Sequence, residues 1–347
     1  MPDPLAETGR ATQSLGPATR SHLIDRVQRA HPEFDTSVVA AAYDYAETMH
    51  APQVRASGDP YFIHPVRVAT YLAEKRLDPA TIATALLHDV VEDTDATNKD
   101  VCKLFGATVG ELVEGVTKLT HLETTSNELK QAENFRKLLL ALSRDIRVLL
   151  VKLSDRLDNM RTLHFISKPE KRARIATETL EIYAPLAARI GMVDLKEELE
   201  DLSFLHLMPE ARDSIMQRTE FLREQGDALT VDIIRQLRQD MADAGLKNVE
   251  INGRIKTPYS IWKKMQTKDL DLGQLSDIVA FRVIVEDIGD CYAALGALHA
   301  TYSHRMGRYK DYISTPKPNG YQSIHTVVIG PEGQSIEVQI RSVDMHN

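Results

Sequence analysis

Hydrophobic positions recur with a helical period up to about residue 245. Val109, Leu112, Val113 and Val116 follow the i, i+3, i+4, i+7 pattern of an amphipathic helix. Gly and Pro lie mostly between such segments. The charged stretch 211–244 contains no Pro and predicts a long helix that carries the chain from one domain to the next. The pattern therefore predicts an all-helical region over this part of the sequence.

After Gly245 the pattern changes to short runs rich in β-branched residues. The runs predicted as strands are 249–253, 278–285, 326–329 and 336–340. Helical stretches near 259–267 and 290–302 lie between them. Strands that alternate with helices predict a mixed α/β layer domain. The chain as a whole is therefore predicted to be a multidomain α+β protein.

The domain boundaries follow from these changes of pattern. Residues 1–20 are rich in Pro, Gly and small polar residues, and they predict a flexible tail. The predicted order after the tail is a helical domain at 21–200, linking helices at 201–250 and the mixed α/β domain at 251–347.

Composition restricts the class of protein. The chain is 43% hydrophobic and 27% charged, which is typical of a globular protein and argues against wholesale disorder. No apolar run approaches the roughly 18–20 residues of a membrane helix, and no secretory signal precedes the helical region. The two cysteines, Cys102 and Cys291, are too far apart for a redox pair or a Cys-rich zinc site. We therefore expect a reduced, cytoplasmic chain.

The net charge of −8 is distributed unevenly. Residues 251–347 carry a net +1 and the preceding residues carry −9. This distribution does not indicate a large face for nucleic-acid binding or a direct nucleic-acid partner. Small anionic ligands remain compatible with it, and two domains of different charge suggest different ligands.

Three separate helical segments place metal-ligating residue types beside apolar positions. They contribute His64, the neighbours His88 and Asp89, and Asp155. Two imidazoles and two carboxylates form a mixed set that suits Mn, Fe, Zn or Mg better than Ca. Four protein ligands on an octahedral ion leave positions open for water and substrate, as hydrolysis requires.

The spacing around these residues adds further polar groups. His88 and Glu92 are four residues apart, so on one helix they would point to the same face. Asp93 follows at the expected helix end. A second polar stripe with helical spacing consists of Asp155, Asn159 and Thr162.

These segments resemble the HD-type hydrolase domain of the RelA/SpoT family. The matching segments are 55–65, 88–94 and 155–162. In that family the domain removes the 3′-pyrophosphate of ppGpp and pppGpp to leave GDP or GTP. The resemblance implies that the Mn²⁺ ligands are His64, His88, Asp89 and Asp155. It implies that Glu92 and Asp93 orient and deprotonate the attacking water, and that the nucleotide is held by Arg55, Ser57, Asn159 and Thr162.

The small residue Ala56 is more typical of the SpoT branch than of the Rel branch, where a Lys is common.

A second group of charged residues lies in the α/β region. Arg254 and Lys256 alternate, so on a strand they face the same side, and Lys264 follows one short segment later. Asp277 opens one β-rich run and Glu337 lies in another. Two acids on neighbouring strands can hold Mg²⁺ against a triphosphate.

The segment 308–325 combines cations, amides and an aromatic ring. Tyr321 offers a ring for stacking, and the preceding Gly320 allows close backbone approach. Phosphate contacts are available from Lys310, Lys317 and His325. No P-loop, GxGxxG or kinase motif occurs, so spacing alone predicts only an anion site.

This region resembles the synthetase domain of the same family. That domain has a nucleotidyltransferase-like fold and moves pyrophosphate from ATP to the 3′-OH of GDP or GTP. The resemblance implies that Asp277 and Glu337 bind Mg²⁺ and activate the 3′-OH, and that Tyr321 stacks on guanine. The residues implied for the ATP phosphates are Arg254, Lys256 and Lys264. Those implied for the acceptor side and phosphates are Lys310, Lys317, Asn319, Gln322 and His325.

Together the two resemblances cover about residues 21–347 and predict a bifunctional, SpoT-like enzyme. Family members usually continue into C-terminal regulatory domains, which we expect to be missing from this sequence. One alternative is a hydrolase-dominant enzyme with a weak or inactive synthetase. Another is a nucleotide-sensing binding protein, which the intact acids argue against. The opposed reactions further predict that the linking helices favour one site at a time.

Overall fold

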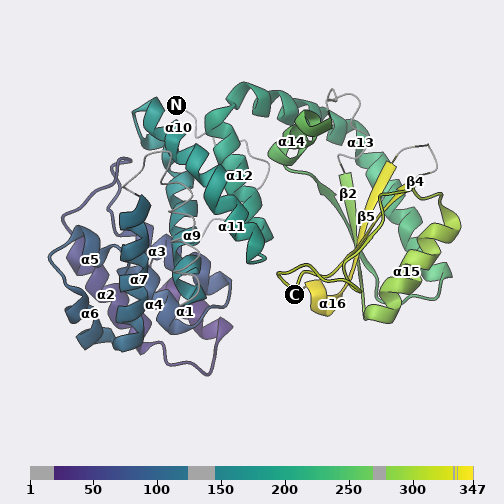
Figure 1. Ribbon diagram of the computed structural model, residues 1–347. Helices are drawn as coiled ribbons and strands as arrows, with labels where there is room; N and C mark the ends of the chain where they lie inside the picture. Colours follow the sequence, from purple (N-terminus) through teal and green to yellow (C-terminus); the bar gives the residue numbers. More distant parts are fainter. Residues whose placement is uncertain (1–18, 124–144, 269–278, 331–332, 334, 347) are drawn as a thin grey trace. The chain divides into compact units, whose positions relative to one another are not determined.

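The computed structural model describes residues 19–123, 145–268, 279–330, 333 and 335–346. The chain divides between Tyr183 and Ala184 into two compact units (Figure 1). Asp277 and nearly all of the predicted tail lie outside the described residues. Among the helices that the structure describes, none combines the length and apolar character that a membrane span requires.

The described part of the first unit is helical. Several helices begin at side-chain caps, as the sequence pattern favours: Asp78 before α4, Thr97 before α6 and Asp145 before α9. The elements are α1 (Arg20–Ala30), α2 (Ser37–His50), α3 (Ile63–Glu74), α4 (Pro79–Leu87), α5 (Val90–Asp93), α6 (Asn98–Phe105), α7 (Ala107–Glu123), α9 (Ile146–Arg161), the 3₁₀ turn η2 (Leu163–Phe165), α10 (Pro169–Glu178) and the π-helical η3 (Thr179–Tyr183).

Helix α9 forms the centre of this unit, with α3, α4 and α7 packed against it (Figure 1). Apolar residues such as Leu149, Leu153 and Leu157 are buried along it, which accounts for its central position. Polar side chains of the same helix, including Asp155 and Asp158, are buried too. Because burying ionised groups without partners is costly, these residues mark the place where the fold must supply partners or a ligand.

The second unit combines helices with one mixed sheet. Its elements are α11 (Ala184–Arg189), α12 (Val193–Leu207), α13 (Pro209–Asp243), β1 (Glu250–Ile255), α14 (Pro258–Lys268), β2 (Val279–Val285), α15 (Ile288–Thr301), β3 (Lys310–Asp311), β4 (Ile324–Ile329), β5 (Ser335–Ser342) and α16 (Val343–His346). The strand order is β1-β2-β5-β4-β3, with β2 and β5 parallel and the other pairs antiparallel. The predicted fold class, a helical domain followed by a mixed α/β domain, is confirmed.

The two faces of the sheet differ in character. Phe281, Val283 and Val338 belong to a buried apolar core that α13 and α15 complete. From α13 this core receives Ile233, Leu237 and Met241, residues that the sequence had assigned to linking helices. Because side chains alternate along a strand, the residues between these apolar positions lie on the other face, which carries the charged groups described below.

Candidate active sites

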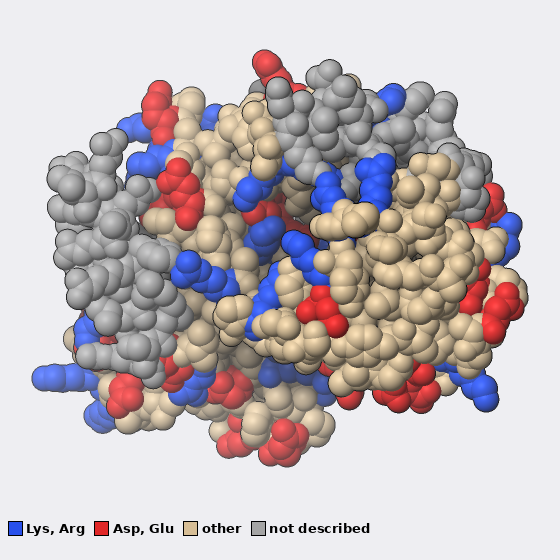
Figure 2. Space-filling model, turned by 45° about the vertical axis from the view of Figure 1, so that its right-hand side comes forward, with Lys and Arg blue, Asp and Glu red and all other residues tan. Residues whose placement is uncertain are grey.

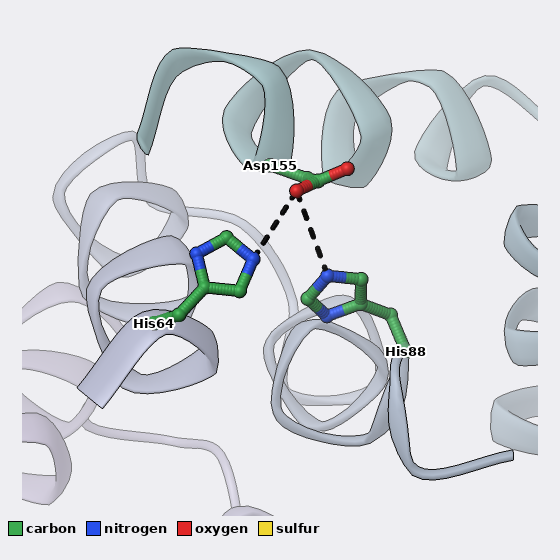
Figure 3. Close-up of side chains that lie close together, drawn as sticks. All are labelled: His64, His88 and Asp155. Atoms are coloured by element: carbon green, nitrogen blue, oxygen red, sulfur yellow. Dashed lines mark ion pairs between the residues drawn. The ribbon is translucent and has the colours of Figure 1, made fainter. Parts of the chain in front are cut away.

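Four elements of the first unit bring the predicted metal ligands together. His64 lies in the first turn of α3, and Asp155 lies in the middle of α9. His88 is the C-cap of α4, and Asp89 is the N-cap of α5. In Figure 3 the two imidazoles and the Asp155 carboxylate point toward one another. One ligand atom from each of these three residues lies within 4.8 Å of the other two.

The carboxylates of Asp155 and Asp89 both face the imidazole Nε2 atoms. Asp155 Oδ1 is 3.2 Å from His64 Nε2 and 3.9 Å from His88 Nε2. Asp89 Oδ1 is 3.2 Å from His88 Nε2, and its Oδ2 is 3.6 Å from His64 Nε2. All four residues predicted as ligands therefore share one location.

Hydrogen bonds orient both imidazoles for a ligand at Nε2. His88 Nδ1 donates to the carbonyl oxygen of Ala85 at 2.7 Å, and a carbonyl can only accept. His64 Nδ1 lies 2.6 Å from Asp158 Oδ2. His88 Nε2 is buried, and none of the described residues forms a hydrogen bond with it. In the neutral ring it offers a lone pair, so the donor set fits a divalent cation.

The electrostatics of the cluster favour the same conclusion. Burial favours neutral imidazole, but Asp155 and Asp158 outweigh it and raise the pKa of His64 to about 9. Burial also disfavours an ionised carboxylate, yet Lys152, His64 and His88 hold the pKa of Asp155 well below its usual range. The same carboxylates that favour a proton on His64 would favour a divalent cation in its place, with the His64 ring then neutral and its Nε2 lone pair directed at the cation.

One sequence prediction about this cluster is wrong. We expected His88 and Glu92 on a single helix, but α4 ends at Leu87 and α5 begins at Val90. The His88 side chain bonds to the carbonyl of Ala85, which would accept from the Asp89 N–H in an uninterrupted helix. The break places His88 and Asp89 at two helix ends that meet in front of α9.

A cavity of about 500 Å³ opens beside this cluster. It is lined by three of the four predicted ligands, His64, Asp89 and Asp155. It is also lined by every other residue predicted for the hydrolase site: Arg55, Ser57, Glu92, Asp93, Asn159 and Thr162. Further cations in the lining are Lys152, Arg156 and Lys171. The cavity therefore joins a cation site to groups that suit an anionic nucleotide.

Several of these lining residues are held by hydrogen bonds. Arg55 donates to Asp158 and to Asn159 Oδ1, the second at 2.7 Å. Ser57 Oγ donates to Asp59 at 3.0 Å, and Thr162 Oγ1 donates to the carbonyl of Asp158 at 3.1 Å. The residues predicted to bind the nucleotide are thus held in place by neighbouring side chains and backbone.

The second candidate site lies on the polar face of the sheet. Glu337 on β5 accepts a hydrogen bond from Lys256 Nζ at 2.7 Å, and Arg254 on β1 pairs with Glu197 of α12. Lys264 lies on α14. The strand register places five polar residues in one row across the sheet: Asn252, Arg282, Gln339, His325 and Lys310. In Figure 2, several Lys and Arg side chains, with an acidic group among them, border the left of the broad uncharged surface on the right of the view. The right and lower edges of that surface carry mostly acidic side chains.

Tyr321 lies among basic groups on this face. Its hydroxyl is 2.8 Å from His325 Nε2 and accepts a hydrogen bond from Arg341 at 3.1 Å, and Lys317 Nζ lies 4.9 Å from its ring centre. Burial, together with Lys317, Arg341 and Lys310, outweighs Glu337 and lowers the pKa of His325 to about 4. His325 is therefore neutral near pH 7, and its Nε2 shares one hydrogen bond with the Tyr321 hydroxyl.

The two remaining predicted residues stabilise the turn around Tyr321. Asn319 Oδ1 accepts from the Tyr321 N–H at 3.2 Å, and Gln322 donates to the carbonyl of Ile313 at 3.3 Å. Gly320 between them has φ +76°, a left-handed conformation that glycine adopts without strain.

Comparison with known proteins identifies both units. Residues 42–193 match the family model described as an HD domain, and residues 253–347 match the model described as a region found in RelA / SpoT proteins. The chain belongs to the RelA/SpoT family. The two matches fall on the unit that carries the His/Asp cluster and on the unit that carries the polar sheet face.

Relatives from this family are similar along nearly the whole chain. The GTP pyrophosphokinase rsh of Brucella ovis is 52% identical over 93% of this chain and 43% of that protein. The GTP pyrophosphokinase of Myxococcus xanthus is 47% identical over 92% and 42%. The bifunctional (p)ppGpp synthase/hydrolase SpoT of Escherichia coli K12 is 48% identical over 92% and 45%. The chain thus spans less than half the length of these relatives.

Sequence reasoning missed several residues that contact the predicted sites. Tyr61 places its hydroxyl 2.8 Å from Asp89 and 3.0 Å from Asp93, and Lys152 pairs with Asp155 at 2.9 Å. Lys152 precedes Asp155 by three residues within α9, a helical spacing that signals a shared face, whereas Tyr61 lies in the turn before α3 and carries no such signal. The other residues overlooked at the two sites are Asp158, Arg282 and Arg341.

Proposed function

We propose that this chain hydrolyses the 3′-pyrophosphate of ppGpp and pppGpp, and that it also transfers pyrophosphate from ATP to the 3′-OH of GDP or GTP. The observation that carries the proposal is the convergence of His64, His88, Asp89 and Asp155 next to a cavity that the carboxylates of Glu92 and Asp93 also line. Guanine nucleotides and ATP are accordingly the proposed ligands, and the cytoplasm is the proposed location.

The ligand types suggest a different metal for each site. Imidazole ligands mixed with carboxylates suit Mn²⁺ among several divalent metals, and Mn²⁺ is the one that the family resemblance implies for the hydrolase cavity. The predicted pair of Asp277 and Glu337 supplies only oxygen, together with substrate phosphates, which suits Mg²⁺ in the synthetase. We therefore propose Mn²⁺ for hydrolysis and Mg²⁺ for pyrophosphate transfer.

In the proposed hydrolysis the chain supplies the base and the anion contacts. A bound divalent ion lowers the pKa of a water molecule and offsets phosphate charge. Glu92 or Asp93 takes the proton from the attacking water, whose oxygen bonds to phosphorus. The bond from phosphorus to the 3′-oxygen breaks, and that oxygen takes up a proton to leave GDP or GTP and pyrophosphate. Tyr61 keeps Asp93 beside the ligand Asp89, and Arg55 holds the nucleotide.

In the proposed transfer the polar sheet face binds both nucleotides. Glu337 and Asp277 would hold Mg²⁺, and one of them takes the proton of the acceptor 3′-OH. The 3′-oxygen bonds to the β-phosphorus of ATP, the bond from that phosphorus to the α-phosphate oxygen breaks, and AMP leaves. Tyr321 stacks on guanine. The ATP phosphates are bound by Arg254, Lys256 and Lys264. The acceptor nucleotide is bound by Lys310, Lys317, Asn319, Gln322 and His325.

Identification of reaction products tests both activities. The chain is incubated with ppGpp and Mn²⁺, with and without a chelator, and separately with ATP, GDP and Mg²⁺. We expect GDP and pyrophosphate from the first reaction, none with chelator, and ppGpp and AMP from the second. Hydrolysis that persists with chelator, or in Asp89→Ala, would overturn the hydrolase assignment.

The same assays separate the two alternatives. Rapid hydrolysis with scarcely measurable transfer would favour a hydrolase-dominant enzyme. Nucleotide binding without turnover at either site would favour a sensor.

A further inference from the structure

Asp158 is a buried carboxylate with no role in the proposed chemistry so far. It lies on α9, three residues after Asp155, and its side chain is 4% exposed. Its Oδ2 atom accepts from two donors on different elements: His64 Nδ1 at 2.6 Å and Arg55 Nη1 at 2.8 Å. One oxygen atom thus contacts both a candidate metal ligand and a candidate nucleotide contact.

The same residues form a closed ring of contacts. Arg55 Nη2 donates to Asn159 Oδ1 at 2.7 Å, and Asn159 Nδ2 donates to Asp155 Oδ1 at 2.5 Å. Asp155 Oδ1 lies 3.2 Å from His64 Nε2, which closes the ring. Arg55, in the segment before α3, is therefore connected to the cation site on both sides, through Asp158 and through Asn159.

The hydrogen bonds that Asp158 accepts are stronger than those between neutral groups. The carboxylate accepts from the Arg55 guanidinium and from Nδ1 of the His64 ring, whose Nε2 faces the candidate cation site. Hydrogen bonds in which one partner is ionised are shorter and stronger than those between neutral groups. A neutral side chain in this place would leave the Arg55 guanidinium without its charged acceptor and would weaken the orientation of the His64 ring.

We propose that Asp158 is a positioning residue that couples cation binding at His64 to nucleotide binding by Arg55. Because both donors share Oδ2, an imidazole fixed by a cation fixes the carboxylate, and the carboxylate fixes the guanidinium that meets the nucleotide. Coupling of this kind is reciprocal, so nucleotide bound to Arg55 also tightens the cation. The inference rests on the proposed hydrolase function, since it assumes that the cavity takes a cation and a nucleotide together.

The test compares Asp158→Asn with the wild type in two measurements. Mn²⁺ affinity is measured without nucleotide, from the electron paramagnetic resonance signal of free Mn²⁺. The KM and kcat for ppGpp hydrolysis are then measured at saturating Mn²⁺. We expect Mn²⁺ affinity to fall by about 10–100-fold, as for other residues that orient a ligand. We also expect KM to rise at saturating Mn²⁺, because Arg55 has lost its acceptor.

A double-variant cycle separates coupling from general damage. Arg55→Lys keeps the charge but loses the two-pronged contact. Arg55→Lys should raise KM when introduced into the wild type, and should raise it much less when introduced into Asp158→Asn. It should also weaken Mn²⁺ binding, although Arg55 contacts none of the four candidate ligands. The matched control is Asp44→Asn, which removes the same charge from an exposed pair with Arg20 on the same unit and should change neither measurement.

The outcomes distinguish this inference from the proposed function. If the wild type neither binds Mn²⁺ nor hydrolyses ppGpp, the proposed function fails and the inference fails with it. If the wild type does both, then unchanged Mn²⁺ affinity in Asp158→Asn, or an unchanged KM, overturns the inference alone. If circular dichroism shows that Asp158→Asn does not fold, the Mn²⁺ affinity of Arg55→Lys alone tests the coupling. Unchanged Mn²⁺ affinity in Arg55→Lys then overturns the inference.

Discussion

Charged side chains are buried to different extents in the helical unit, next to the cavity, and on the polar face of the sheet. In the cavity, Asp155 and Asp158 are almost fully buried, and each is held by imidazole and by a cationic side chain. On the sheet, Glu337 and its partner Lys256 are each about one-fifth exposed. Burial makes the first group strongly interdependent, whereas water moderates the interactions of the second group.

This difference predicts different responses to mutation. A change at the buried charged groups Asp155 or Asp158 should alter cation binding, folding stability and catalysis together, because each of them partners several other groups. A change on the sheet face should alter nucleotide binding or catalysis with a smaller effect on stability. The predictions below test that contrast.

The largest expected effect is the loss of hydrolysis in Glu92→Gln. The amide cannot take a proton from water, so the hydrolysis rate should fall by about 10²–10⁴-fold. Mn²⁺ affinity and pyrophosphate transfer should be retained, as measured by Mn²⁺ titration and by ppGpp formation. Glu111→Gln, an exposed acid on α7, is the control and should leave hydrolysis unchanged. A similar loss in both variants would argue against Glu92 as the base.

Glu337→Gln should produce the converse result. Transfer from ATP to GDP should fall by about 10²-fold, near the lower limit for an acid–base group, because the predicted Asp277 carboxylate is still present. Hydrolysis should be unaffected. Glu250→Gln, an exposed acid on β1, is the matched control. Loss of hydrolysis in Glu337→Gln would show that the two reactions do not have separate sites.

Much of the fold follows from local sequence patterns. The long helix predicted at 211–244 is α13, Pro209–Asp243, and each predicted strand overlaps an observed one. The four candidate ligands also follow from residue type. Few types of side chain bind a cation, and each of these four lies beside apolar positions. Helical spacing explains the contact from Asn159 to Asp155 within α9.

The rest depends on contacts between distant parts of the chain. Arg55 and Asp158 are 103 positions apart and His64 and Asp158 are 94 apart, so no local pattern reveals that they meet. The break between α4 and α5 depends on the hydrogen bond that the His88 side chain makes. Likewise, the core contribution of Leu237 and Met241 appears only when α13 is packed against the sheet.

A smaller effect concerns the buried pair of Lys152 and Asp155. Lys152→Met removes a cation from a buried carboxylate and should lower the free energy of unfolding by about 3 kcal/mol, measured by urea denaturation. Mn²⁺ should restore part of this loss, because it supplies positive charge to the same carboxylate. Lys118→Met, which breaks an exposed pair with Glu114, should cost less than about 1 kcal/mol. Equal costs in the two variants would contradict the contrast between buried and exposed charge.

The smallest expected effect is a pH dependence due to His325. Its pKa is about 4 in the folded chain and about 6.5 in an unfolded one. The unfolded state therefore binds the proton first as pH falls, and this histidine makes the folded state less stable at lower pH. Between pH 7 and 5.5 its contribution should be a loss of about 1 kcal/mol. His325→Gln should show a correspondingly shallower pH dependence in urea denaturation, whereas exposed His304→Gln should match the wild type.

The most direct test of the central claim is the location of Mn²⁺ in crystals of the chain, from an anomalous difference map. The account predicts one strong peak between Nε2 of His64 and His88 and the carboxylates of Asp89 and Asp155. A peak elsewhere in the first unit, or a well-ordered cavity with no peak at saturating Mn²⁺, would contradict it.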